Sequence, residues 1–264
     1  MDLQLKGKTA FVSGSTQGIG YAIAKQLLLE GAAVTINGRT EARVAEAVEK
    51  LKGHVPGAPV NGIAADFSKA DDVRKLTEQL PGIDILVNNA GIFEPKPFTE
   101  ITDEEWLRFF EVNVMSGIRL SRHYFPGMLE KNWGRIIFIS SESAIMIPEE
   151  MIHYGTTKTA QLSISRGLAL LTKNTGVTVN TIMPGPTKSE GVVEFIKQVA
   201  ESKGITPQEA EKDFFKTMRP SSLLQRFADV AEIANMVTYI ASPLSSATNG
   251  AALKAEGGLV NSIY

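Results

Sequence analysis

The feature that most restricts the fold of this chain is a regular alternation between short apolar runs and longer segments with a helical pattern. The apolar runs are rich in β-branched residues and lie at 9–14, 33–37, 60–65, 83–89, 134–141, 177–183 and 250–255. Helical patterns separate them at 18–30, 41–51, 69–80, 103–131, 156–173, 189–217, where we expect a break, and 229–241. Most of the apolar runs are nearly continuous, which is typical of parallel strands covered on both faces. We therefore predict an α/β fold in which a doubly wound, mostly parallel sheet of seven strands carries helices on both faces.

Composition narrows the class of protein further. The 264 residues carry a net charge of −2, which gives no electrostatic reason to expect a nucleic-acid partner. The absence of cysteine excludes disulfides, thiolate chemistry and cysteine–zinc sites, and no other pattern indicates a metal site. No apolar run approaches the roughly 20 residues that span a bilayer, and the first residues lack an apolar signal core. We expect a cytoplasmic protein with no membrane partner.

One long segment, 186–226, interrupts the alternation. We treat residues 1–264 as a single domain and this segment as a mostly helical insertion. It could pack on the core as a structural element, or it could cover a pocket at the strand ends as a lid, and we favour the lid. Thr206 and Glu209 form a capping-box pattern within it, as Thr102 and Glu105 do before the 103–131 helix.

A glycine-rich turn joins the first strand to the first helix. The stretch SGSTQGIG places glycines at Gly14, Gly18 and Gly20. Glycine permits a tight turn and a close approach of the backbone to a pyrophosphate, and the following helix N-terminus offers free N–H groups. A purely structural turn is the alternative, but the position after the first strand of a βαβ chain favours dinucleotide binding.

Together with four other stretches, this turn resembles the short-chain dehydrogenase/reductase family, including its 3-oxoacyl-acyl-carrier-protein reductase-like members. The other stretches are Asn88-Asn89-Ala90-Gly91 after the fourth strand, Asn113 in the next helix, Ser141 placed 13 residues before Tyr154, and Pro184-Gly185 with Thr187 beyond. Their order matches from about residue 6 to 260. The resemblance implies a Rossmann-type fold, hydride transfer between a nicotinamide cofactor and a carbonyl or secondary alcohol, and a homotetramer.

Tyr154 and Lys158 are four residues apart, a spacing that places two side chains on one face of a helix. A free tyrosine has a pKa of about 10, and a neighbouring ammonium should lower it toward the working pH. Tyr154 could then act as the general acid or base. The resemblance further implies that Ser141 bonds the reacting oxygen, that Lys158 binds the ribose, and that Asn113 holds a water of a proton relay. Ser140 is the alternative to Ser141, and the interval to Tyr154 favours Ser141.

The second strand ends without the acidic residue that usually bonds the ribose 2′-hydroxyl of NAD. Arg39 stands there and could meet a 2′-phosphate, so we expect NADP(H), with NAD(H) possible. Gln17 argues the other way, because many NADP-using relatives carry a basic residue at its position. The expected cofactor contacts are Gly14, Ser15, Thr16, Gln17, Gly18, Ile19, Gly20, Arg39, Asp66, Phe67, Asn89, Ala90, Gly91, Tyr154, Lys158, Pro184, Gly185 and Thr187.

The substrate should be a small carbonyl compound or alcohol, held by residues near 92–98, 142–153 and 186–218. Glu142 could select a polyol, an amine or another cationic group, although we expect its side chain to point outward. Lys131, Arg135 and Lys173 are the candidates for docking an acyl-carrier protein, a role that we do not favour. The alternative function is a dinucleotide-binding sensor or scaffold without turnover, against which the intact Ser141–Tyr154–Lys158 set argues.

Overall fold

Seven strands form one sheet in the order β3-β2-β1-β4-β5-β6-β7, and every neighbouring pair is parallel. The computed structural model describes residues 1–263. The strands are β1 Thr9–Val12, β2 Ala33–Gly38, β3 Val60–Ala64, β4 Ile85–Asn88, β5 Gly134–Ile139, β6 Val177–Pro184 and β7 Ala252–Ala255. The predicted seven-stranded α/β fold is confirmed, and the sheet is parallel throughout rather than mostly so.

The helices follow the predicted pattern with one exception. They are α1 Gly18–Leu29, α2 Glu41–His54, α3 Ala70–Gln79, α4 Asp103–Phe110, α5 Ser116–Glu130, α6 Ile152–Leu170, α7 Glu190–Lys203, α8 Pro207–Thr217 and α9 Val230–Ala241. The expectation of one helix over 103–131 was wrong, because a π-helical turn at Glu111–Met115 separates α4 from α5. Apolar periodicity does not detect such a turn, since the helix continues on both sides of it.

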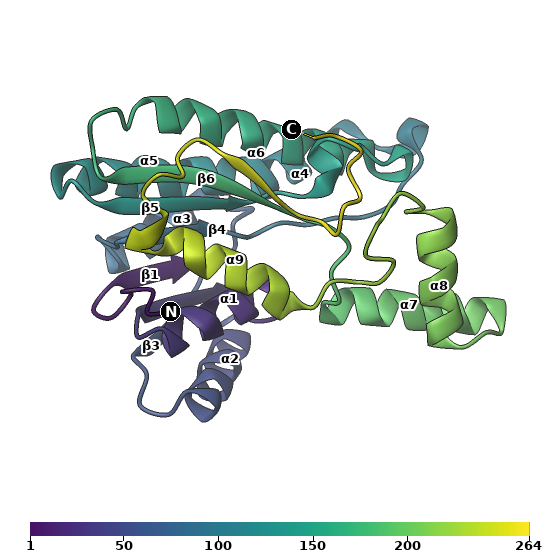
Figure 1. The fold of residues 1–264 in the computed structure, drawn as a ribbon, viewed down its shortest axis with the longest axis horizontal. Helices are drawn as coiled ribbons and strands as arrows, with labels where there is room; N and C mark the ends of the chain where they lie inside the picture. The colour runs from purple at the N-terminus through teal and green to yellow at the C-terminus, as the bar shows by residue number, and fades with distance from the viewer. Residues whose placement is uncertain (264) are drawn as a thin grey trace.

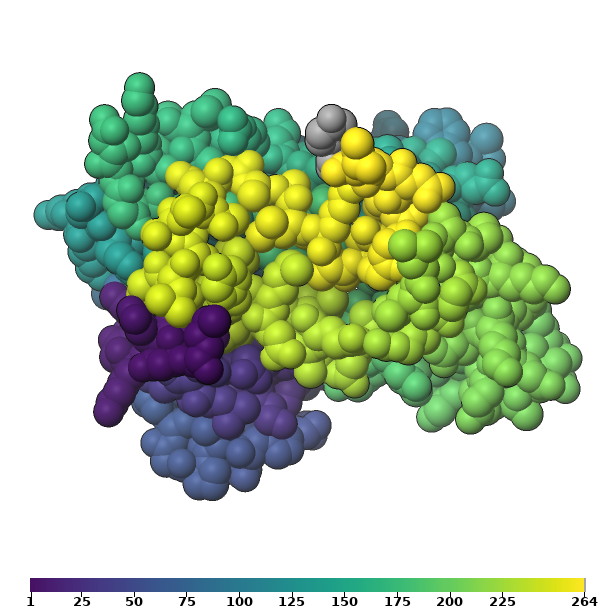
Figure 2. All heavy atoms as spheres, viewed as in Figure 1, coloured from purple at the N-terminus to yellow at the C-terminus, as the bar shows by residue number. Residues whose placement is uncertain are grey.

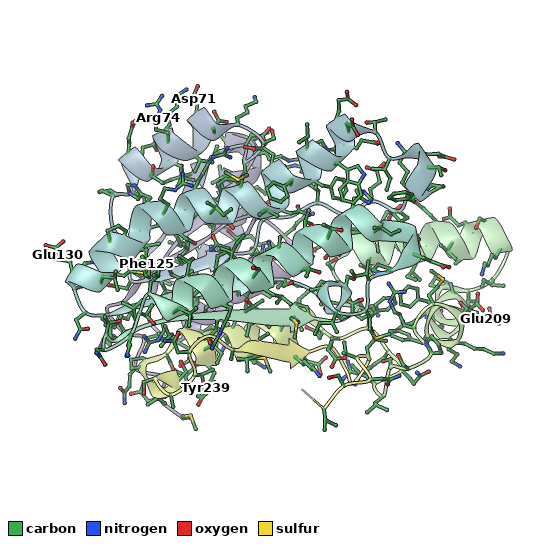
Figure 3. All side chains as sticks on the ribbon, turned by 90° about the horizontal axis from the view of Figure 1, so that it is seen from above. Asp71, Arg74, Phe125, Glu130, Glu209 and Tyr239 are labelled. Carbon is green, nitrogen blue, oxygen red and sulfur yellow. The ribbon has the colours of Figure 1, made fainter. Side chains whose placement is uncertain are left out.

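Alternate residues of each strand face opposite layers of helices. In β1, Ala10 and Val12 pack with α1, α2 and α9, whereas Phe11 packs with α3, α5 and α6 on the other face. Figure 1 shows these two layers on either side of the sheet, and Figure 3 views the second from above, with Asp71 and Arg74 on α3 and Phe125 on α5. Because both faces are covered, the strands have few polar positions, as their sequences indicated.

The strand order reverses between β1 and β4, from which the chain proceeds outward in both directions. Connections leave the carboxyl ends of these two strands toward opposite faces and leave a crevice between them, where ligands of doubly wound sheets bind. The glycine-rich turn follows β1, and Asn89 follows β4, so the topology brings both to this crevice.

The insertion at 186–226 contains α7 and α8, which form a helical hairpin with a small core of its own. Ile196, Ala200, Ala210, Phe215 and Phe227 make that core. Figures 1 and 2 show the hairpin projecting to one side of the molecule, beside the last residues of the chain.

Short-range signals fix where several helices begin. The predicted capping boxes at Thr102 and Thr206 are both present, and a third at Asp229, which we did not predict, starts α9. In each, the side chain of the capping residue accepts a backbone N–H bond of the first turn while a glutamate returns the bond. Within residues 1–263, no helix combines the length and the apolar character needed to cross a membrane.

Candidate active site

The glycine-rich turn is built for close contact between its backbone and its neighbours. Gly14 and Gly18 both have φ +60°, a conformation that costs glycine little. At Gly20 a Cβ atom would lie 2.4 Å from Nδ2 of Asn89 and 2.5 Å from the carbonyl oxygen of Gly14. The N-terminus of α1 can therefore approach the turn only because Gly20 has no side chain. The cradle and the backbone amides at the start of α1 fit a dinucleotide pyrophosphate.

Hydrogen bonds from two asparagine side chains hold the glycine-rich turn in place. Asn37 at the end of β2 accepts a hydrogen bond from Gly14 N (3.1 Å), and its backbone N–H donates to Ser15 Oγ (2.9 Å). Asn89 donates from Nδ2 to the carbonyl oxygens of Ser13 (3.0 Å) and Gly14 (2.8 Å). The hydroxyl of Ser15 also donates to the carbonyl oxygen of Val12 (2.6 Å), and its backbone N–H donates to the carbonyl oxygen of Asn37 (2.8 Å), so both groups of Ser15 hold the turn against β2. The sequence did not predict that Asn37 holds the turn. It showed only that the second strand ends without an acidic residue.

A carboxylate from the insertion contacts the same turn. Glu190, at the start of α7, accepts a hydrogen bond from the backbone N–H of Gly18 at 2.8 Å. The first turn of α1 is the part of the structure best suited to bind a phosphate, and Glu190 places negative charge against it. This contact was not predicted, because the two residues are far apart in the sequence and Glu190 belongs to no short motif.

Tyr154 and Lys158 lie on α6 as the spacing predicted. The ammonium nitrogen of Lys158 is 5.5 Å from the centre of the Tyr154 ring and donates to the carbonyl oxygen of Ile139 at 2.9 Å. Burial lowers the pKa of Lys158 to about 8, and the carboxylate of Glu142 opposes that shift. Lys158 thus loses its proton much more easily than an ordinary lysine.

The pKa of Tyr154 departs from the sequence expectation. Burial is the largest cause and raises the pKa of the phenol well above its ordinary value, and the carboxylate of Glu142 raises it further. A hydrogen bond with Ser141 acts in the opposite direction but does not outweigh these effects. The expected lowering by Lys158 does not dominate, so Tyr154 is held in its protonated form.

The two neighbouring serines at the end of β5 face different partners. Ser140 donates its hydroxyl to the carbonyl oxygen of Lys158 at 2.9 Å and thereby ties α6 to the sheet. Ser141 instead lies beside Tyr154 and donates to Oε2 of Glu142 at 2.5 Å. This arrangement favours Ser141 over Ser140 as the serine of the reaction site.

Asn113 lies in the π-helical turn and is buried. Its side chain accepts from the backbone N–H of Ile92 (2.7 Å) and donates to the carbonyl oxygen of Ile92 (3.0 Å) and to Thr157 Oγ1 (3.0 Å). Its own carbonyl oxygen accepts from Nε2 of Gln161 at 2.6 Å. A Cβ atom on Gly91 would lie 3.4 Å from Lys158 Nζ and 3.5 Å from Asn113 Oδ1. Gly91, Asn113 and Lys158 are therefore brought together, whereas the proposed relay water stays a prediction.

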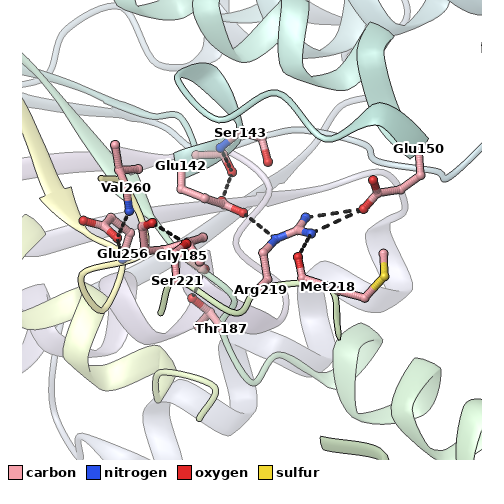
Figure 4. Close-up of polar contacts among 12 residues, drawn as sticks. Glu142, Ser143, Glu150, Gly185, Thr187, Met218, Arg219, Ser221, Glu256 and Val260 are labelled. Carbon is pink, nitrogen blue, oxygen red and sulfur yellow. Dashed lines mark hydrogen bonds and ion pairs between the residues drawn. The ribbon is translucent and has the colours of Figure 1, made fainter. Parts of the chain in front are cut away.

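Glu142 corrects one expectation directly, because it points inward. Its residue is 6% exposed, and its Oε1 lies 3.5 Å from Nε of Arg219. Arg219 follows α8, and its Nη2 also lies 3.4 Å from Glu150. Figure 4 shows the guanidinium between the two carboxylates. The insertion is thus joined by an ion pair to the residue that follows Ser141.

Part of the region expected to hold the adenosine is exposed to solvent. Arg39 lies at the surface beyond β2. Partial burial tends to raise the pKa of Asp66, but hydrogen bonds from Ser68 and the positive charges of Lys69 and Arg39 hold it below its ordinary value. Asp66 accepts from both N (3.0 Å) and Oγ (2.8 Å) of Ser68, so it stabilises a turn rather than capping α3. Phe67 is 5% exposed and belongs mainly to the core.

At the end of β6, Pro184 is followed by Gly185, and Thr187 donates to the carbonyl oxygen of Gly185 at 2.8 Å. Gly185 packs so closely on the following strand that a Cβ atom would lie 2.6 Å from the carbonyl oxygen of Glu256. Glu256 accepts from the backbone N–H of Val260 at 3.1 Å. The glutamate in this last turn therefore makes a local backbone cap.

Two further residues, His153 and Arg135, are buried. His153 is 1% exposed and packs against Trp106 and Phe109, with ring centres 5.9 and 4.0 Å away, so it is a core residue. Arg135, a candidate for docking a carrier protein, is 2% exposed and donates to backbone carbonyl oxygens, including that of Gly176 at 2.8 Å. That assignment was wrong for Arg135, because a buried guanidinium cannot form part of an exposed basic surface.

Comparison with known proteins decides the family. Residues 8–200 match the family model described as short chain dehydrogenase. The chain belongs to the short-chain dehydrogenase/reductase family. It is 53% identical to the uncharacterized oxidoreductase YvaG of Bacillus subtilis over the full length of both chains. It is 31% identical to the 3-oxoacyl-[acyl-carrier-protein] reductase FabG of Vibrio cholerae, covering 97% of this chain and 99% of the relative.

Among solved structures, the L-sorbose reductase of Gluconobacter frateurii, complexed with NADPH and L-sorbose, matches this short-chain dehydrogenase/reductase with a TM-score of 0.94. The two are 30% identical, and the match covers 100% of each chain, so it includes the α7–α8 hairpin. As a member of the family, the chain is an oxidoreductase that acts on carbonyl or alcohol substrates with NAD(P)(H).

Proposed function

We propose that this protein is an NADP(H)-dependent reductase of small carbonyl compounds in which Tyr154 is the general acid. The observation that carries the proposal is the convergence of Ser141, Tyr154 and Lys158 beside the crevice at the strand ends. Ser141 and Tyr154 share a hydrogen bond, and Lys158 lies 5.5 Å from the phenol ring centre. A sensor that only binds a dinucleotide would not need this set.

The charges around Tyr154 favour reduction. When bound, a reduced nicotinamide supplies a hydride to the carbonyl carbon. Tyr154 stays protonated at neutral pH because burial and Glu142 raise its pKa, so it has a proton to give to the carbonyl oxygen. Ser141 hydrogen-bonds the same oxygen, and Lys158, with a pKa of about 8, retains its positive charge near neutrality. Its ammonium stabilises the phenolate that remains after the proton has left.

The preference for NADP(H) rests on the end of β2. No carboxylate stands there to bond a ribose 2′-hydroxyl, and Arg39 is exposed and free to meet a 2′-phosphate. The structurally similar L-sorbose reductase was solved with NADPH, which supports the same choice. Gln17 at the start of α1 adds no positive charge, so Arg39 alone would provide the discrimination.

The α7–α8 hairpin completes the proposed site as a lid. It approaches the glycine turn through Glu190 and the catalytic serine through the Arg219–Glu142 pair. Exposed apolar side chains surround the region between these contacts, including Phe93 (56% exposed), which packs edge-on against the ring of Tyr154. Closing of the hairpin would remove water from these groups.

The test is turnover by wild type and by Tyr154→Phe. Oxidation of NADPH and NADH is followed optically over a panel of ketones, aldehydes, sugars and acyl thioesters, and the reverse reaction over alcohols. We expect NADPH-dependent reduction by wild type and a loss of roughly 100-fold or more in Tyr154→Phe, because general acid catalysis contributes that much. Calorimetric titration should show unchanged NADPH binding by the variant. Cofactor binding by wild type without turnover of any compound, in either direction, would support a sensor instead.

A further inference from the structure

Glu142 is a charged group whose direct contact with Ser141 has no part in the proton transfer from Tyr154. The residue is 6% exposed and follows Ser141 directly. Carboxylates are seldom buried to this extent without a partner, since the loss of hydration is costly. Each of its oxygen atoms has a defined neighbour, because Oε2 accepts from the hydroxyl of Ser141 at 2.5 Å and Oε1 lies 3.5 Å from Nε of Arg219. The carboxylate is therefore placed at the reaction site and held there.

The ion pair with Arg219 decides which ligand this carboxylate suits. Arg219 is itself fixed by Glu150 (3.4 Å) and by its Nη1 hydrogen bond to the carbonyl oxygen of Met218 (2.8 Å). Because the guanidinium already balances the charge of Glu142, and Lys158 is also nearby, a cationic substrate would meet two positive groups. Oε2 remains a strong acceptor of a neutral donor, and the donor that it has in the structure is a hydroxyl.

Substrate binding changes the partners of Ser141. The hydroxyl of Ser141 has one proton, which it donates to Glu142 in this structure. When Ser141 donates that proton to a carbonyl oxygen, Oε2 of Glu142 loses its donor. A buried acceptor left without a donor costs free energy, and more so when it is charged. A hydroxyl group on the substrate, next to the carbonyl, would take the place of Ser141.

The spacing of the donor Ser141 Oγ and the acceptor Glu142 Oε2 agrees with this exchange. Ser141 Oγ and Glu142 Oε2 are 2.5 Å apart, so two substrate groups that are close neighbours can contact both at once. Oxygen atoms on adjacent carbons of a ketol lie within about the length of one hydrogen bond, on the order of 2.7 Å. We propose that Glu142, held by Arg219, makes the enzyme selective for carbonyl substrates with a hydroxyl on the carbon next to the carbonyl. This inference rests on the proposed reductase function and adds the substrate class.

Three small ketones test the inference. Hydroxyacetone, methoxyacetone and acetone share one carbonyl environment but differ at the neighbouring carbon, and only the first can donate a hydrogen bond. We expect the kcat/KM of wild type with NADPH to be at least about tenfold higher for hydroxyacetone than for the other two, as for a hydrogen bond to a charged acceptor. Glu142→Met keeps the length of the side chain without an acceptor and should reduce this ratio to near one. Glu142→Gln, a milder change, should reduce it severalfold.

The matched control is Glu149→Gln, which removes an exposed carboxylate from the same loop. For this variant, the ratio of kcat/KM for hydroxyacetone to that for the other two ketones should equal the wild-type ratio. Wild type that reduces all three ketones with similar kcat/KM, or a Glu142→Met variant that keeps the ratio, would overturn the selectivity. Reduction of other ketones in the broad panel with no preference for hydroxyacetone would do the same. If wild type reduces no carbonyl compound of the panel, the result would instead overturn the reductase function.

Discussion

At the scale of single residues, burial and the charge of Glu142 set the pKa values of Tyr154 and Lys158. Burial disfavours the charged form of both Tyr154 and Lys158, raising one pKa and lowering the other. Glu142 favours the protonated form of both. A protonated phenol beside an ammonium whose pKa is about 8 is a combination suited to giving a proton near neutral pH.

The first prediction concerns the pH profile of Glu142→Gln. Removing the carboxylate takes away an effect that raises the pKa of Tyr154 and of Lys158, so both pKa values should fall. In wild type, kcat/KM for reduction should decline as the pH rises through about 8, where Lys158 loses its proton. We expect this decline to move to lower pH in the variant. Initial rates measured from neutral to alkaline pH with saturating NADPH would show the shift.

Glu149→Gln is again the control and should keep the wild-type profile. A Glu142→Gln profile that is unchanged, or that moves to higher pH, would mean that Glu142 does not act electrostatically on the two groups.

The second prediction concerns cofactor choice. Arg39→Ala should raise the KM for NADPH by roughly 10-fold or more, the usual size of a lost charge-assisted bond, while leaving the KM for NADH nearly unchanged. Arg39 is exposed, so the substitution should not disturb folding. Arg43→Ala, one turn into α2, provides a control of equal charge. Equal effects of Arg39→Ala on the two cofactors would rule out recognition of a 2′-phosphate.

Motifs within a few residues of one another could be predicted from the sequence, and pairs between distant segments could not. Tyr154 and Lys158 are joined by helix geometry, and Gly14, Gly18 and Gly20 by the demands of one turn. Glu142 and Arg219 belong to different segments, and nothing in either stretch indicates that the other is near. The inward direction of Glu142 follows from the path of the insertion, which local patterns do not fix.

At the scale of elements, the α7–α8 hairpin has contacts at two ends of the site. Glu190 reaches the glycine turn and Arg219 reaches Glu142, so one insertion contacts both the proposed cofactor region and the proposed substrate region. Capping boxes predicted the starts of α4 and α8 because each depends on residues three apart. The π-helical turn around Asn113 had no such signal, since it depends on the contacts of Asn113 with Ile92 and Thr157.

The third prediction tests the contact between α7 and the glycine turn. Glu190→Gln keeps an acceptor for Gly18 N–H and removes the negative charge beside the expected pyrophosphate. The affinity for NADPH should rise by about two- to fivefold, because a charge near a helix terminus contributes roughly 0.3–1 kcal/mol. Calorimetric titration of the purified protein gives the Kd directly.

Glu194→Gln is the control, since Glu194 is one turn further along α7 and does not contact the glycine turn. Its Kd should equal that of wild type. Weaker NADPH binding by Glu190→Gln would show that the carboxylate supports the turn rather than opposing the phosphates.

At the scale of the whole molecule, the sheet topology was the most predictable property. Seven apolar runs and the helices between them allow few arrangements once crossovers are right-handed, and the order β3-β2-β1-β4-β5-β6-β7 is one of these. The assembly of copies is different, because it depends on which surface side chains meet. The outer surface of the α4–α6 layer exposes Leu107 (70%) and Phe110 (43%), two apolar residues close together on α4.

The fourth prediction is that the protein is a homotetramer in which α4, α5 and α6 pair between copies. Light scattering after size exclusion should give four times the 28.6 kDa mass of one chain. Leu107→Asp should yield smaller species with unchanged helix content. Leu107 contributes little to the fold of one chain, whereas an aspartate at this position would place a charge in the apolar contact between copies. Leu29→Asp, at another exposed leucine (53%) on α1 in the opposite layer, should remain tetrameric. A wild-type protein with the mass of one chain at micromolar concentration, or identical masses for wild type and Leu107→Asp, would show that this surface does not join the copies.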